Sequence, residues 1–125
     1  MGFHICPFCK KPTDPRKYSN LSSGDVTLRF MSGRDFMMPD MVLHYVVDHG
    51  YLPPVTFIAE VMDGEIVTAD RWQTKGIVER IAYLEDENFE KGEVPFGFVE
   101  KLEQLMLSSA PPEDRELYRK MLYSK

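Results

Sequence analysis

The first regular pattern along the chain is an alternation of polar and apolar residues. Residues 25–31, DVTLRFM, alternate with a period of two, which is typical of a strand with one buried face. The preceding residues 6–24 are rich in proline, serine and other turn formers, and SGRD at 32–35 has the composition of a turn. The pattern therefore predicts one half-buried strand behind a turn-rich N-terminal segment.

Beyond this strand, apolar residues recur every three or four positions, as on the buried face of a helix. The predicted helices cover residues 41–49, 55–62, 74–85, 95–107 and 113–122, and a short strand covers 65–69. We expect Asp40 to cap the first helix and Gly50 to end it, because aspartate accepts from free amides and glycine adopts positive φ at low cost. In the last helix, the spacing turns Leu117, Met121 and Leu122 toward the core.

Composition places the chain among ordinary globular proteins, with 43% apolar and 28% charged residues. No apolar run approaches the roughly 20 residues of a membrane-spanning helix. The first residues lack the basic and apolar parts of a signal peptide. We therefore expect a cytoplasmic protein, in which a C-x2-C pair is more often metal-binding or catalytic than a structural disulfide.

Both cysteines lie in the sequence CPFC, at Cys6 and Cys9. This sequence looks like the redox motif of glutaredoxins, in which a helix N-terminus lowers the pKa of the first thiol. That arrangement needs a strand before the motif and a helix after it. Only five residues precede Cys6, and Pro12 and Pro15 interrupt the segment that follows, so the pattern disfavours redox chemistry.

A metal site is the favoured interpretation, because His44 and His49 complete a C-x2-C-x34-H-x4-H pattern. Two thiolates and two imidazoles form a closed tetrahedral zinc site, which is structural rather than catalytic. Positions five apart on a regular helix diverge by about 140°. His49 directly precedes Gly50, however, where the last turn can tighten or unwind and let the two imidazoles converge.

An ordinary alternative treats the spacing as coincidence. Free cysteines often behave as small hydrophobes, and helical histidines are usually hydrogen-bonded core or surface residues. His4 has no assigned role, and is either a surface residue or a substitute ligand. Trp72 is either a surface anchor for a partner or part of the core.

Residues 39–57, PDMVLHYVVDHGYLPPVTF, resemble a helix–corner–helix of small, uncharacterised bacterial proteins. Their pattern is roughly P-x-L-I-x-H-Y-x3-H-x-Y-x-P-P-x-x-F, often after an N-terminal C-P-x-C. The resemblance covers about the first half of the chain. It implies that Cys6, Cys9, His44 and His49 form one zinc-finger-like constellation, and it implies no activity.

The same stretch suggests which side chains surround such a site. Tyr45 and Tyr51 either wall the metal or pack in the core. Residues of the second helix, Val55 and Phe57 among them, are expected to pack against the site. Together the elements predict an α+β fold, mostly helical, with a small zinc-knuckle and β lobe. We expect one domain over 1–125, with this lobe at 1–35 and a helical part at 36–125.

Charge and motifs narrow the function. Residues 1–35 carry six basic and three acidic side chains, a net of +3, while the rest carry nine basic and seventeen acidic ones, a net of −8. The sequence holds no P-loop, G-x-G-x-x-G, G-x-S-x-G or H-E-x-x-H pattern, so no catalytic residue is assigned.

Three functions stay open. The favoured one is a non-catalytic protein-interaction domain with a structural Zn²⁺, whose partner is another protein or a second copy of the chain through the helices at 95–107 and 113–122. The second is a nucleic-acid-binding module, which the acidic total disfavours. Its phosphate-facing residues would be Lys10, Lys11, Arg16, Lys17, Arg29 and Arg34. The third is a zinc- or thiol-dependent enzyme.

Overall fold

The computed structural model describes residues 4–9, 17–22, 24–70, 78–86, 88–110 and 112–123. Its strands are β1 (His4–Ile5), β2 (Leu21–Ser22), β3 (Asp25–Phe30), β4 (Asp35–Pro39), β5 (Ile66–Asp70) and β6 (Glu79–Arg80). Its helices are α1 (Val42–His49), α2 (Val55–Asp63), α3 (Phe98–Leu107) and α4 (Arg115–Leu122), with a 3-10 turn at Pro112–Asp114.

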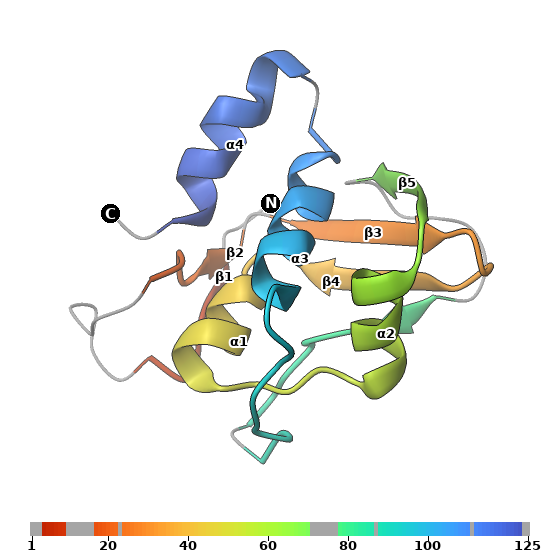
Figure 1. The fold of residues 1–125 in the computed structure, drawn as a ribbon. Helices are drawn as coiled ribbons and strands as arrows, with labels where there is room; N and C mark the ends of the chain where they lie inside the picture. Colours follow the sequence, from red (N-terminus) through yellow and green to blue (C-terminus); the bar gives the residue numbers. More distant parts are fainter. Residues whose placement is uncertain are drawn as a thin grey trace.

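The centre of the fold is a four-stranded sheet with the order β5-β3-β4-β6 (Figure 1). β3 and β4 form an antiparallel hairpin across a turn in which Gly33 has φ 94°, a conformation that glycine adopts at low cost. β5 pairs antiparallel with β3, whereas β6 runs parallel to β4. The short strands β1 and β2 make a separate pair near the N-terminus.

The prediction of a mostly helical chain is wrong, because strands from both halves of the sequence join one sheet. β4 was not predicted, since its residues FMMP are apolar without alternation and are buried throughout. The helix predicted over 74–85 is also wrong where the structure describes it, because β6 and an irregular segment occupy 78–85. Residues 74–77 lie outside the described residues. The amide of Ile81 donates to the carbonyl of Met37 at 2.8 Å, a long-range pairing that local periodicity does not reveal.

The other elements agree better with the sequence. The strands predicted over 25–31 and 65–69 are β3 and β5, and the helices predicted over 41–49 and 55–62 are α1 and α2. Gly50 ends α1 with φ 72°, as expected, but Met41 rather than Asp40 occupies the N-cap position and no side chain caps the helix. The helix predicted from residue 95 begins at Phe98, after Gly97.

One face of the sheet is covered by α1, α2 and α3 (Figure 1). Its side chains include Leu28 and Phe36, which lie opposite one another in the register of β3 and β4 and are fully buried. The Phe36 ring packs edge-on against Phe57 of α2 at 5.1 Å, and Phe57 in turn contacts Phe98 of α3 at 6.1 Å. This aromatic chain joins the sheet to two helices and forms the core that positions α1.

The C-terminal helix α4 packs differently from the prediction. Leu117 and Met121 are 62% and 44% exposed, whereas Tyr118 and Leu122 are buried. Only Leu122 of the predicted inward set faces the core. The helix packs against α3 through a narrow stripe of side chains. In the described part of the chain, no helix has both the length and the apolar character needed to cross a bilayer.

A buried carboxylate fastens the two ends of the described chain together. Glu103 of α3, 8% exposed, accepts hydrogen bonds from the hydroxyls of Tyr18, at 3.1 Å, and Tyr123, at 2.8 Å. The two tyrosine rings stack at 5.2 Å, and the amide of Ser19 donates to the carbonyl of Leu122 at 2.8 Å. Burial, followed by the charge of Glu103, raises the pKa of Tyr18. Glu103 therefore holds the N-terminal arm against the C-terminal segment.

Replacing Glu103 with alanine leaves two tyrosine hydroxyls without their shared acceptor. We expect Glu103→Ala to lower the free energy of unfolding by about 2–4 kcal/mol, measured by urea denaturation. Glu100→Ala, on the exposed face of the same helix, is the matched control and should change it by less than about 0.5 kcal/mol. Equal effects of the two variants would show that the buried contacts do not stabilise the fold.

Candidate metal centre

The segment that carries both cysteines is a tight turn fixed at each side. The amide of Cys6 donates to the carbonyl of Asn20 at 2.8 Å, which continues the pairing of β1 with β2. The amide of Phe8 donates to the Cys6 sulfur at 3.4 Å. The Phe8 ring is buried against Tyr45 at 5.8 Å and Phe89 at 5.4 Å, so this aromatic anchors the knuckle, residues 5–9, in the core.

Both histidines lie on α1, and the end of this helix brings them together. The amide of Gly50 donates to the carbonyl of Tyr45, five residues earlier, instead of continuing the regular i to i−4 pattern. A bond of this kind widens the last turn, as in a π-type turn. His49 therefore lies nearer to the face of His44 than a regular helix allows, and the two rings lie edge to face at 4.7 Å.

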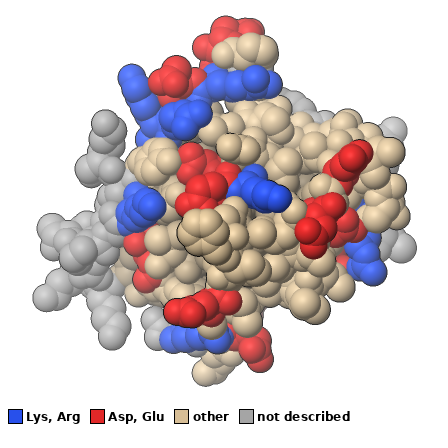
Figure 2. Space-filling view, viewed as in Figure 1, with Lys and Arg blue, Asp and Glu red and all other residues tan. Residues whose placement is uncertain are grey.

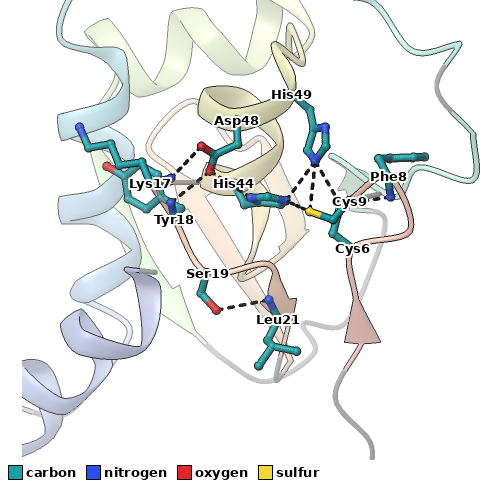
Figure 3. A network of polar contacts seen from close by, with 10 residues as sticks. All are labelled: Cys6, Phe8, Cys9, Lys17, Tyr18, Ser19, Leu21, His44, Asp48 and His49. Atoms are coloured by element: carbon teal, nitrogen blue, oxygen red, sulfur yellow. Dashed lines mark hydrogen bonds and ion pairs between the residues drawn. The ribbon is translucent and has the colours of Figure 1, made fainter. Parts of the chain in front are cut away.

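The four predicted ligands converge on one point (Figure 3). One donor atom from each of Cys6, Cys9, His44 and His49 lies within 4.8 Å of all the others. The Cys6 sulfur is 3.4 Å from Nε2 of His49, and the Cys9 sulfur is 3.3 Å from Nε2 of His44. The two Nε2 atoms are 3.1 Å apart. The four residues are thus close enough to bind a metal ion.

These separations are those of ligands around one small cation. In a tetrahedral zinc site with ordinary bond lengths, two nitrogens lie about 3.3 Å apart and a nitrogen and a sulfur about 3.6 Å apart. The corresponding distances here are 3.1 Å between the nitrogens and 3.3–3.7 Å between nitrogen and sulfur. A chance cluster of polar side chains has no reason to reproduce that set of separations.

Asp48 orients one of the imidazoles. Its Oδ2 lies 3.0 Å from Nδ1 of His44, and because a carboxylate accepts, the imidazole donates from Nδ1. The lone pair of His44 is then on Nε2, which faces the thiols. Asp48 also accepts from the amides of Lys17, at 2.8 Å, and Tyr18, at 3.1 Å (Figure 3). One carboxylate therefore joins the histidine helix to the N-terminal arm.

The sequence patterns did not reveal this role of Asp48. The informative signal is the spacing of His44 and Asp48, which are four apart and share a face of the helix. The sequence also gave no role to Phe8, which fixes the knuckle.

Burial governs the electrostatics of the cluster. Cys6 is 3% exposed and His44 is 1% exposed, whereas Cys9 and His49 are half-buried. Burial raises the pKa of the Cys6 thiol to about 11. Burial, followed by the charges of Cys6 and Cys9, raises the pKa of Tyr45. A cation bound among the four donors would supply the positive charge that a buried thiolate needs.

Of the side chains predicted to surround the site, one lies beside it and the others lie elsewhere. Tyr45 does lie beside the cluster, with its ring centre 6.0 Å from that of His44. Tyr51 packs against Phe89 at 5.7 Å and accepts from an amide elsewhere in the core. Phe57 packs on the sheet and α3, and Val55 is 77% exposed, so the prediction that these two pack against the site is wrong.

Some predictions fall outside the described residues. These are the proposed effects of Lys10, Lys11, Pro12 and Pro15, the two interpretations of Trp72, and the side chain of His4.

The contacts of Asp48 predict a metal-binding defect in Asp48→Asn. The substitution removes the charge that holds the imidazole of His44 in place, so we expect the affinity for a metal ion to fall by about 10- to 100-fold. Competition titration with a chromophoric chelator measures the change. Asp63→Asn, at the exposed end of α2, is the control and should leave the affinity unaltered. Identical affinities for the two variants would rule out the orienting role.

Comparison with known proteins gives a match to one family model over the N-terminal segment and no activity. Neither the curated proteins nor the solved structures contain a match to this chain. The N-terminal segment, by contrast, corresponds to an uncharacterised domain, as the resemblance of its motif implied. Residues 1–62, which contain all four converging side chains, match the family described as a domain of unknown function, DUF7919.

Proposed function

We propose that Cys6, Cys9, His44 and His49 bind one structural zinc ion, and that the chain is a non-catalytic protein-interaction domain. The observation that carries the proposal is the convergence of four donor atoms within 4.8 Å, with separations that match a tetrahedral site. Zinc would link the N-terminal knuckle to α1, two segments that are 35 residues apart between Cys9 and His44.

The donor set favours zinc among the common metal ions. Thiolate and neutral imidazole are the ligands of structural zinc sites, whereas calcium and magnesium prefer oxygen. The orienting carboxylate of Asp48 beside His44 is an arrangement common around zinc-bound histidine.

A structural role is supported by the closure of the site. Four protein ligands leave no position for a water or a substrate. Phe8 and Tyr45 pack beside the cluster and are buried, which limits access to Cys6. Catalysis at the metal would require one of the four ligands to leave.

As a class of partner, protein is better supported than nucleic acid. Two of the basic residues considered for phosphate contact already face carboxylates: Arg29 lies 3.0 Å from Asp35, and Arg34 lies 3.9 Å from Glu60. Figure 2 shows acidic and basic side chains interspersed on one face of the molecule. Lys10, Lys11 and Arg16 lie outside the described residues. The net charge of −5 also opposes binding to phosphates.

Metal analysis tests the zinc proposal directly. The full chain, purified under reducing conditions without chelator, should contain one zinc per molecule, and Co²⁺ in its place should give the visible spectrum of a tetrahedral sulfur-ligated site. A protein that holds less than a tenth of an equivalent, even after incubation with zinc, would refute the proposal.

A further inference from the structure

A cleft of about 810 Å³ opens beside the candidate metal centre. It lies between the knuckle and the segment that follows β6, and its volume is in the range of sites for drug-sized ligands. Neither the metal-binding role of the four converging residues nor the match to the family model explains the function of this cleft.

The near side of the cleft is built from the elements that carry the cluster. Ile5 and Pro7 come from the knuckle, and Met41 and Tyr45 come from α1 and the residue before it. Ile5 is 66% exposed, so a large apolar side chain faces the open space. Because Cys6 lies between Ile5 and Pro7, metal bound there would hold this wall in place.

The far side depends on an unusual backbone conformation. Ala82 has φ 67°, a region that residues other than glycine seldom adopt and that costs about 1 kcal/mol or more. Its amide donates to the hydroxyl of Tyr51 at 3.3 Å, which helps to hold the turn. The chain leaves the sheet at this point, and Tyr83 and Glu85 line the cleft.

One hydroxyl at the cleft makes no hydrogen bond to the described residues. Tyr45 lines the cleft and is only 3% exposed. In the part of the chain that the structure describes, no hydrogen bond involves its hydroxyl. Since this hydroxyl is not one of the buried side-chain atoms without a partner, it is open to solvent and can bond to a ligand group in the cleft.

The charges of the cleft favour a basic ligand. The lining of the cleft holds one basic residue, Arg80, which lies over the Tyr83 ring at 5.2 Å, and two acidic residues, Asp25 and Glu85. Glu85 is exposed, and none of the ion pairs among the described residues involves it. The remaining uncompensated charge at the cleft is therefore negative.

We propose that this cleft binds a short segment of a partner protein that carries a large apolar side chain next to a lysine or arginine. The apolar side chain packs against Ile5 and Met41, the cation pairs with Glu85, and a backbone group of the segment bonds to the Tyr45 hydroxyl. The assignment rests on the proposed function, because the metal is taken to hold the wall formed by the knuckle.

Selection from a randomised heptapeptide library displayed on phage tests the assignment, with the zinc-loaded full chain as bait. We expect enriched peptides to contain an apolar residue beside a basic one. The synthetic peptide is then titrated at physiological salt against the wild type, Glu85→Lys, Tyr45→Phe and the control Glu113→Lys, an exposed glutamate distant in sequence from the cleft. The zinc content of each variant is measured in parallel.

The expected result is a loss of about fivefold in affinity for Glu85→Lys, a loss of roughly threefold for Tyr45→Phe, and no change for Glu113→Lys. An absence of enrichment, enrichment of acidic peptides, or equal binding to Glu85→Lys and wild type would overturn the assignment. If the chain holds no zinc but the selected peptides still depend on Glu85 and Tyr45, the metal proposal fails and the cleft assignment stands.

Discussion

Removing zinc from the loaded protein should lower its midpoint of thermal unfolding by about 10–20 °C. A ligand present at about 1,000 times its Kd stabilises the folded state by about 4 kcal/mol, which corresponds to a shift of this size in a chain of 125 residues. Apart from the metal, the knuckle is held by the Phe8 ring and by β1, which is two residues long and pairs with β2. Differential scanning calorimetry with and without a zinc chelator gives the shift.

The loss of stability on removing zinc should also be confined to one part of the chain. Without metal, we expect amide hydrogen exchange to accelerate at residues 4–9 and 17–22, which the knuckle and Asp48 tie to α1. The amides of β3 and α3 should keep their protection, because strand pairing and the contacts of Phe36, Phe57 and Phe98 hold these elements without the four donor residues. Restoring zinc should reverse both effects and magnesium should reverse neither. An unchanged melting temperature would contradict a stabilising metal.

Replacing one of the four ligands should have the second large effect, which is a loss of affinity for zinc. Cys9→Ser removes one thiolate from a half-buried position, so the change leaves little cavity in the core. Structural zinc sites bind with about 10–16 kcal/mol from four ligands, so the loss of one thiolate should weaken binding by roughly a hundredfold or more. Competition with a chelator of known affinity measures the loss, and the absorption of a sulfur-ligated Co²⁺ site should fall with it.

Val47→Ser is the matched control, since Val47 is 37% exposed on the helix that carries both histidines. It should bind zinc as the wild type does. If Cys9→Ser retained the wild-type affinity, the thiol of Cys9 would not be a ligand. His4, whose side chain lies outside the described residues, would then be the first residue to test by the same titration.

The elements that could be predicted from the sequence are those marked by a short-range pattern of residues. The alternation over 25–31 is β3, and the helix before Gly50 is α1 with the expected left-handed C-cap. The convergence of the four candidate ligands was also predictable, because it depends on two short spacings and on a helix end. The way in which that end adjusts, by a widened turn from Tyr45 to Gly50, follows from the backbone and not from residue types.

Long-range pairing could not be predicted from the sequence. The parallel partner of β4 is β6, more than forty positions later, and Ile81 with Leu84 mimics helical spacing. Residues 36–39 of β4 are apolar and buried without alternation, so the strand has no period of two to reveal it. Counting apolar residues also failed on α4, where Tyr118 faces the core and Leu117 does not.

The same reason explains why the partners of the site were missed. Asp48 acts on His44 within one helix, but its other two contacts come from the backbone of Lys17 and Tyr18. Any residue could donate those amides, so no side-chain motif marks them. The Tyr83 and Glu85 side of the cleft depends likewise on the positive φ of Ala82, which its residue type does not indicate.

X-ray absorption at the zinc edge of the loaded full chain tests the central claim most directly. The account predicts one zinc with two sulfurs at about 2.3 Å and two nitrogens at about 2.0–2.1 Å, with no further oxygen ligand. Spectra of Cys9→Ser should show one sulfur fewer. A shell of oxygen and nitrogen ligands without two sulfurs, or a six-coordinate ion, would contradict the closed Cys2His2 site formed by Cys6, Cys9, His44 and His49.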